Sequence, residues 1–229
     1  MLELLQIPER SRNSNGRLAP QEIGRTGTLS HMRTWRRLIA ALGPAAGRLG
    51  LRKGATETSI VAAETLMASR LPSDYRAWLA IADGQDTEAL SILPAGGWLV
   101  SIDRMLERWT HERNFDLEED DTETQDDDRV RWLVFHPKRI PIGGWYDLEG
   151  DTTVIDLIPG PAGVAGQLMD YVSECDFEVI ATSFDAYLDR VAELVETRQL
   201  VVVETDSGPQ LNVPDGTGRW EWLVRGEPR

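Results

Sequence analysis

Apolar residues recur with helical spacing in several stretches of the chain. Trp35, Leu38, Ile39 and Leu42 fall at positions i, i+3, i+4 and i+7, and Gly43-Pro44 ends the pattern. The same reasoning predicts further helices, and each begins at a residue suited to a helix start. They start at Thr56, at Pro72 or Ser73, at Ser101 and at Ser183, and the last is long.

From residue 139 onward the pattern changes to short apolar runs separated by turn residues. The runs cover 140–148, 152–158, 165–172 and 177–181. Gly150 in the first turn can take the positive φ that a two-residue hairpin demands. Four short strands joined by tight turns predict an antiparallel meander. Shorter strands are expected at 90–93, 98–100, 129–135 and 200–204.

The order of these elements predicts an α+β fold. A mostly antiparallel sheet, with the meander at its centre, should pack with several N-terminal helices and one long C-terminal helix. Residues 1–31 lack sustained apolar periodicity and predict a flexible basic extension. Residues 32–205 would form the α+β domain. Residues 206–229 would form a C-terminal extension, in which alternation of Trp220, Trp222 and Val224 indicates a final strand.

Asp156 is a polar exception within the strand predicted at 152–158. It shares one face with Val154 and Ile158, so its carboxylate should lie between two apolar neighbours. A charge in such a place needs a partner. We expect Asp156 to bind backbone N–H groups of the Gly-rich turn that follows, which is a structural and not a catalytic role.

The charge of the chain is strongly negative and unevenly placed. Its net charge is −14. Residues 1–60 hold ten Lys/Arg against four Asp/Glu, whereas the remainder holds fourteen against thirty-four. Nucleic acid and anionic membranes are poor partners for such a surface, and a basic protein is a good one. Within it, residues 116–128 contain nine acidic residues in thirteen, which predicts an exposed loop.

Motifs of catalysis and cofactor binding are not found in the sequence. The acidic run lacks the glycine and spacing of a Ca²⁺ loop, and Gly160, Gly163 and Gly166 match neither a dinucleotide fingerprint nor a P-loop. A hydrolase would have to use Asp147, Glu149, Asp151 and Asp156, most of which lie at a predicted turn. We therefore expect no enzyme, no metal and no cofactor.

The cysteine content, the apolar runs and the first residues of the chain indicate its compartment. The single cysteine, Cys175, excludes an internal disulfide. No apolar run approaches the roughly 20 residues of a membrane span, and the first residues lack a secretory pattern. A cytoplasmic protein is therefore expected.

Trp145 and Tyr146 adjoin an acidic turn, where the aromatic rings could anchor a basic protein and the carboxylates could steer its approach. The alternative is that Trp145 belongs to the core. The candidate partner-binding residues are Glu118, Glu119, Asp120, Asp121, Trp145, Tyr146, Asp147, Glu149 and Asp151.

Three segments in this order resemble the SUKH superfamily: LPSDYRAWLAIADGQ, IPIGGWYDLEGDTTVIDLIPGPAGVAGQ and VIATSFDAYLDRVAELVE. The resemblance runs from about Thr34 to Leu200. The superfamily's motif positions map onto Leu71, Pro72, Asp74, Tyr75, Gly84, Gln85, Pro141, Ile142, Trp145, Asp156, Gly160, Gly163, Gly166 and Gln167. Its bacterial members are mostly immunity proteins against polymorphic toxins, and its fungal members include a regulator of cell-wall synthesis.

The resemblance implies a protein-binding function. The first hypothesis is an immunity protein that covers the active site of a cognate secreted toxin, which would be basic and for which a nuclease is one candidate. The alternative is a non-catalytic regulatory scaffold that binds several host proteins. The motif positions are expected to define the fold and not the partner surface.

Overall fold

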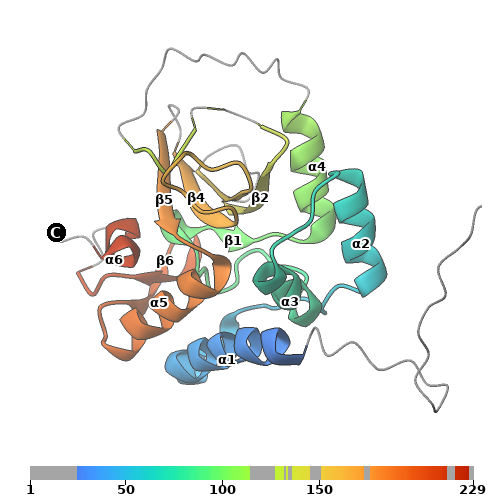
Figure 1. The fold of residues 1–229 in the computed structure, drawn as a ribbon. Helices are drawn as coiled ribbons and strands as arrows, with labels where there is room; N and C mark the ends of the chain where they lie inside the picture. The colour runs from blue at the N-terminus through green and yellow to red at the C-terminus, as the bar shows by residue number, and fades with distance from the viewer. Residues whose placement is uncertain are drawn as a thin grey trace, which may run out of the picture.

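The computed structural model describes residues 25–113, 127–131, 133, 136–144, 151–172, 176–215 and 220–226. Within these ranges it has six α-helices, a five-stranded sheet and a two-stranded sheet (Figure 1). The helices are α1 (Arg25–Leu42), α2 (Glu57–Leu66), α3 (Ser73–Ile81), α4 (Ile102–Glu112), α5 (Phe184–Glu196) and α6 (Glu221–Arg225). The strands are β1 (Trp98–Leu99), β2 (Arg139–Gly144), β3 (Thr152–Asp156), β4 (Gln167–Val172), β5 (Asp176–Ala181), β6 (Val201–Thr205) and β7 (Gly208–Asn212). The predicted α+β class is confirmed.

The helix starts are set by capping side chains. The Thr56 hydroxyl accepts a hydrogen bond of 3.1 Å from the Ser59 N–H, and Ser101 and Ser183 do the same for α4 and α5. Each cap satisfies one of the N–H groups that the first turn of a helix leaves without a partner. The predicted starts of α2, α4 and α5 are therefore confirmed.

The large sheet is the predicted meander. Its strand order is β1-β2-β3-β4-β5, and every neighbouring pair is antiparallel. Ile140 pairs with Ile155, and Ile155 pairs with Leu168, so one face carries a continuous apolar row. These three side chains are fully buried in the main core.

Helices cover this apolar face in layers. Figure 1 shows α3 and α5 beneath the sheet and α1 beyond them. α1 packs against both α3 and α5, and α4 packs beside β2. Trp35 of α1 meets Trp78 of α3 edge to face, with ring centroids 4.5 Å apart. The helical stripes read from the sequence thus form the main core.

The opposite face of the sheet has a smaller apolar cluster. Val154, Met169, Phe177 and Val179 lie on this face, and Val130 packs over them. Val130 belongs to the described segment 127–131, which therefore crosses this face of the sheet. The structure assigns no strand to the described part of the stretch predicted as a strand at 129–135.

The C-terminal predictions need correction. The final strand predicted around Trp220 is helix α6, because Trp220, Leu223 and Val224 bury their side chains at helical spacing. The long helix predicted after Ser183 exists as α5, with 13 residues, but β6, β7 and α6 follow it. A long C-terminal helix is therefore not found in the described part of the chain.

One further strand prediction differs from the structure. The stretch 90–93 forms only an isolated bridge, between Ser91 and Gln210, in place of a strand. The boundary predicted at residue 32 falls inside α1, which begins at Arg25. At the other end, Leu211 and Trp220 belong to the main core, so the described residues after 205 pack with the domain.

Candidate functional site

Most predicted partner-binding residues cannot be placed. Glu118, Glu119, Asp120, Asp121, Trp145, Tyr146, Asp147 and Glu149 lie outside the described residues. Asp151 is described and half-buried, directly before β3. There Thr152 pairs with Gly144, which in turn pairs with Trp98 of β1. We call this the hairpin end of the sheet.

A groove of 420 Å³ opens beside the hairpin end. It is lined by Arg52, Gln85, Thr87, Trp98, Leu99, Val100, Ser101, Arg104 and Gly144. Two guanidinium groups therefore lie beside Gly144, the last described residue before the predicted acidic turn. The sequence reasoning missed this groove, because its residues come from four separate segments.

The outer edge of β1 is closed by Gln85. Its backbone N–H donates to the Leu99 carbonyl at 2.8 Å, and its side-chain oxygen accepts from the Leu99 N–H at 3.1 Å. The side-chain nitrogen donates to the carbonyls of Leu49 and Leu90. A partner strand would have to displace Gln85 before it could pair with β1.

At the opposite end of the sheet, Asp156 is fully buried. One carboxylate oxygen accepts from the Ile158 N–H and the other from the Gln167 side chain, both at 3.0 Å. The prediction is confirmed in part, because Asp156 does accept from a backbone N–H, but the donor is Ile158, which precedes the Gly-rich turn. The Gly-rich turn bonds differently, because the Gly166 N–H donates to the main-chain carbonyl of Asp156.

Arg139 is the cation of this buried network. Its Nε lies 3.8 Å from Asp156 Oδ1, which is an ion pair beyond hydrogen-bond distance. Its other nitrogens donate to the carbonyls of Arg131 and Leu133, and the guanidinium lies 4.2 Å from the Phe177 ring centroid. Burial lowers the pKa of Arg139 to about 10, against the opposing pull of Asp156. Arg139 thus ties the segment before β2 to the sheet.

The glycines of the turn 157–166 serve close backbone contacts. A Cβ on Gly160 would lie 2.3 Å from the Asp128 carbonyl oxygen, and one on Gly163 equally close to that of Arg129. The Gly160 N–H also donates to the Arg129 carbonyl at 2.9 Å. Packing against residues 127–131 explains these glycines without a phosphate ligand.

Asp74 joins two helices. One carboxylate oxygen accepts from the Tyr75 N–H at 2.9 Å and the other from the Asp185 N–H at 3.0 Å. The first turn of α5 is therefore bonded to the first turn of α3. Tyr75 is fully buried and meets Phe184 edge to face at 5.2 Å.

The carboxylates considered for a hydrolase are not brought together where they are described. Asp151 and Asp156 lie at opposite ends of β3, about 17 Å apart at 3.3 Å per residue. Among the described residues, no three His, Cys, Asp or Glu side chains are grouped so that they could hold a metal ion. None of the described helices has the length and apolar character to cross a membrane.

Comparison with known families agrees with this geometry. Residues 54–190 match the SMI1/KNR4 family, also described as SUKH-1. The chain belongs to this family. A segment of 95 residues, 41% of the chain, is 33% identical to the cell wall biosynthesis/cell cycle regulator smi1 of Schizosaccharomyces pombe. That segment spans 18% of the yeast protein.

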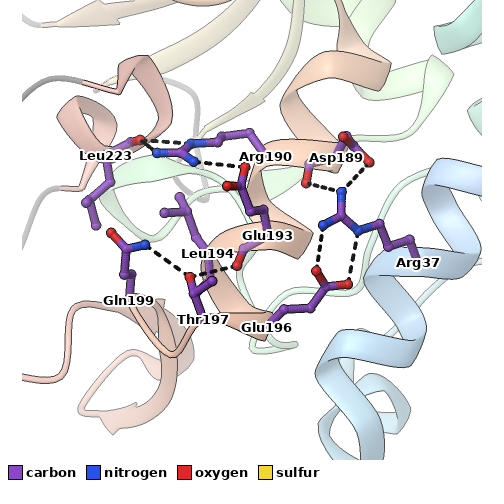
Figure 2. Close-up of polar contacts among 9 residues, drawn as sticks. All are labelled: Arg37, Asp189, Arg190, Glu193, Leu194, Glu196, Thr197, Gln199 and Leu223. Carbon is purple, nitrogen blue, oxygen red and sulfur yellow. Dashed lines mark hydrogen bonds and ion pairs between the residues drawn. The ribbon is translucent and has the colours of Figure 1, made fainter.

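Elements outside the SMI1/KNR4 match are attached to α5 from two sides (Figure 2). From α1, Arg37 binds Asp189 at 2.7 Å and Glu196 at 2.5 Å. From the other side, Arg190 donates to the Leu223 carbonyl of α6 at 3.0 Å. The matched segment thus supplies the five-stranded sheet and the first half of α5, and the flanking helices α1 and α6 pack against α5.

Proposed function

We propose that the protein is an immunity protein, which binds a cognate secreted toxin in the cytoplasm and covers the toxin's active site. The observation that carries the proposal is how the family's motif residues are used. Asp74, Gln85, Asp156 and Gln167 are buried, and their side chains bond to neighbouring elements of the same chain. Such residues define a scaffold, so recognition is left to exposed segments.

The acidic segment 116–128 and the connection between β2 and β3 are the segments best suited to that recognition. The first begins shortly after α4 and leads to the described residues Asp127 and Asp128. Its carboxylates would attract a basic cleft of the kind that a nucleic-acid-cleaving toxin carries, and would occupy it in place of phosphate. The cationic groove beside Gly144 would accept an acidic side chain on the rim of that cleft.

Co-expression tests the proposal directly. The chain is produced together with the toxin domain encoded next to it, and growth and complex formation are measured. Rescue of growth with a stable complex is expected. Growth arrest with no complex would refute the proposal, provided that the chain is soluble and folded.

A charge-neutralised variant tests whether the acidic segment attracts the toxin electrostatically. Replacing Glu118, Glu119, Asp120 and Asp121 with their amides should slow association about tenfold at low salt, and should flatten its dependence on ionic strength. Surface plasmon resonance over a salt series measures both. The free energy of unfolding should be unchanged within about 0.5 kcal/mol.

The matched control neutralises four exposed acids elsewhere. They are Glu57, Glu204, Asp206 and Asp215. This control has the same net charge as the test variant. It therefore separates the effect of the acidic segment on the association rate from the effect of the total charge. Equal on-rates for the two variants would place the interface away from the acidic segment.

A further inference from the structure

Three arginines from separate parts of the chain surround one pocket. The pocket has a volume of 310 Å³ and lies where β5, α5, α6 and the segment 127–131 meet. Its lining consists of Arg129, Val179, Ile180, Ala181, Thr182, Ala186, Arg190, Val224 and Arg225. Within the described residues, the polar side chains of this lining are three guanidinium groups and one hydroxyl, with no carboxylate.

All three guanidinium groups are held by carboxylates outside the lining, and Arg190 Nη1 lies 2.9 Å from Glu193 Oε2. Arg129 Nη2 lies 2.6 Å from Asp127 Oδ2, and Arg225 Nη1 lies 2.5 Å from Glu178 Oε2. Ion pairs as exposed as these are individually weak. An anion that meets two or three guanidinium groups at once can therefore share them or displace these carboxylates.

The guanidinium of Arg190 is also fixed by the main chain. Arg190 donates through Nε and Nη2 to the Leu223 carbonyl, at 3.2 and 3.0 Å (Figure 2). Leu223 belongs to α6, so the same contact fixes the helix that carries Arg225. The positions of these two cations are thereby coupled, and the pocket is formed before any ligand arrives.

The lining also includes residues at the start of helix α5. Thr182 and Ala186 of the lining flank Ser183, the N-cap of the 13-residue helix α5. The N–H groups of Asp185 and Ala186 there donate to the Asp74 carboxylate and the Ser183 hydroxyl, so the partial positive charge of the helix start is already compensated and the three guanidinium groups supply the positive charge of the pocket. In residues 61–229 acids outnumber bases by thirty-four to fourteen, whereas the described lining of this pocket has three arginines and no carboxylate.

We infer that this pocket binds an oxyanion, the phosphate or carboxylate group of a small ligand or of a partner's side chain. Arginine forks fit both groups with paired hydrogen bonds. A volume of 310 Å³ is at the lower limit of small-molecule sites, about 300–1,000 Å³, which favours a single anionic group over a whole nucleotide cofactor. Arg225 lies outside the SMI1/KNR4 match, so the site goes beyond both the family assignment and the proposed toxin binding.

Calorimetric titration of the isolated full chain with inorganic phosphate, at constant ionic strength, tests the inference. Saturable binding at one site is expected, and Arg129→Gln should weaken it about tenfold. The main-chain carbonyl of Arg129, which accepts from Gly160 and Gln167, is kept in this variant. Arg225→Lys retains the positive charge but not the paired N–H donors of the guanidinium. Its phosphate affinity should therefore fall by less than that of the Arg129→Gln variant.

The matched control is Arg48→Gln. Arg48 is also an exposed arginine paired with a carboxylate, Glu204 at 2.5 Å, but it does not line the pocket. Its phosphate affinity should stay within about twofold of wild type. Titrations with phosphoserine and with a peptide that ends in a free carboxylate then identify the source of the oxyanion. No saturation, or equal losses in the Arg129 and Arg48 variants, would overturn the site.

Discussion

Two arginines of this protein meet carboxylates in opposite surroundings. The Arg139 side chain is 3% exposed and its Nε lies 3.8 Å from the fully buried Asp156. The Arg37 side chain is 35% exposed and binds Glu196 and Asp189 directly. Burial lowers the pKa of Arg139, whereas hydrogen bonds to Glu196 and Asp189 raise the pKa of Arg37 above its ordinary value.

The difference shows what each contact can do. A buried charge must keep every partner it has, because no water replaces a partner that is lost. The Arg139 network therefore fixes how strands and turns join within the family fold. An exposed charge exchanges its partner for water at little cost. The Arg37 contact therefore attaches α1 to α5 without being essential to the fold.

Asp156→Ala should give the largest effect. It removes the carboxylate opposite Arg139 and the acceptor for Ile158 and Gln167, so the free energy of unfolding should fall by about 3–5 kcal/mol. Urea denaturation followed by circular dichroism measures this. The loss should be the same at low and high salt, since the site is shielded from ions. The control Asp151→Ala, at the half-buried position directly before the same strand, should change stability by less than about 1 kcal/mol. If both variants lost the same free energy of unfolding, the complete burial of Asp156 would not be the cause of the larger effect expected there.

Gly160→Ala should give an intermediate effect. The added methyl group would lie 2.3 Å from the Asp128 carbonyl oxygen and 2.9 Å from the Val130 nitrogen, both of them backbone atoms. The segment beside the Arg139 network must then move, at a cost of about 2 kcal/mol. Gly47→Ala is the matched control, because a methyl group there meets nothing within 4 Å. If the Gly160 variant were as stable as the Gly47 variant, the contact with residues 127–131 would not be needed.

Arg37→Gln should give the smallest effect and the one most sensitive to conditions. Arg37 lowers the pKa of Glu196 below its ordinary value of 4.5. The stability from this pair is therefore present above pH 4.5 and is lost as the pH falls through the lowered pKa. The difference in the free energy of unfolding between wild type and variant should shrink as the pH falls below 4.5, and it should also shrink in high salt. Arg36→Gln, at an exposed position of the same helix, should show neither trend. A difference in the free energy of unfolding that does not shrink as the pH falls would show that the Arg37 side chain acts through packing.

The sequence was informative wherever a local rule acts. Thr56, Ser101 and Ser183 cap helices because a hydroxyl at that position reaches a nearby N–H, whatever the rest of the chain does. The need of Asp156 for a partner was predictable from its two apolar neighbours. Helix α6 was misread because Trp220, Trp222 and Val224 fit alternation, and a short apolar run does not distinguish strand from helix.

The candidate sites were less predictable than the fold. No spacing links Arg52 with Arg104, or Arg129 with Arg225, since each pair is far apart in the sequence and meets only across packed elements. The predicted acidic and aromatic site residues, apart from Asp151, lie outside the described residues. Their role stays a prediction that the charge-neutralised variant tests.

By itself, the sequence determined the starts of α2, α4 and α5, the antiparallel meander, the acidic surplus and the family to which the chain belongs. These follow from contacts between near neighbours or from composition, which do not depend on how the chain closes. Only the tertiary structure decided which partner each buried charge has, that α1 and α6 cover α5, and that three arginines share one pocket. Such contacts join residues distant along the chain, and their geometry exists only once the core has brought them together.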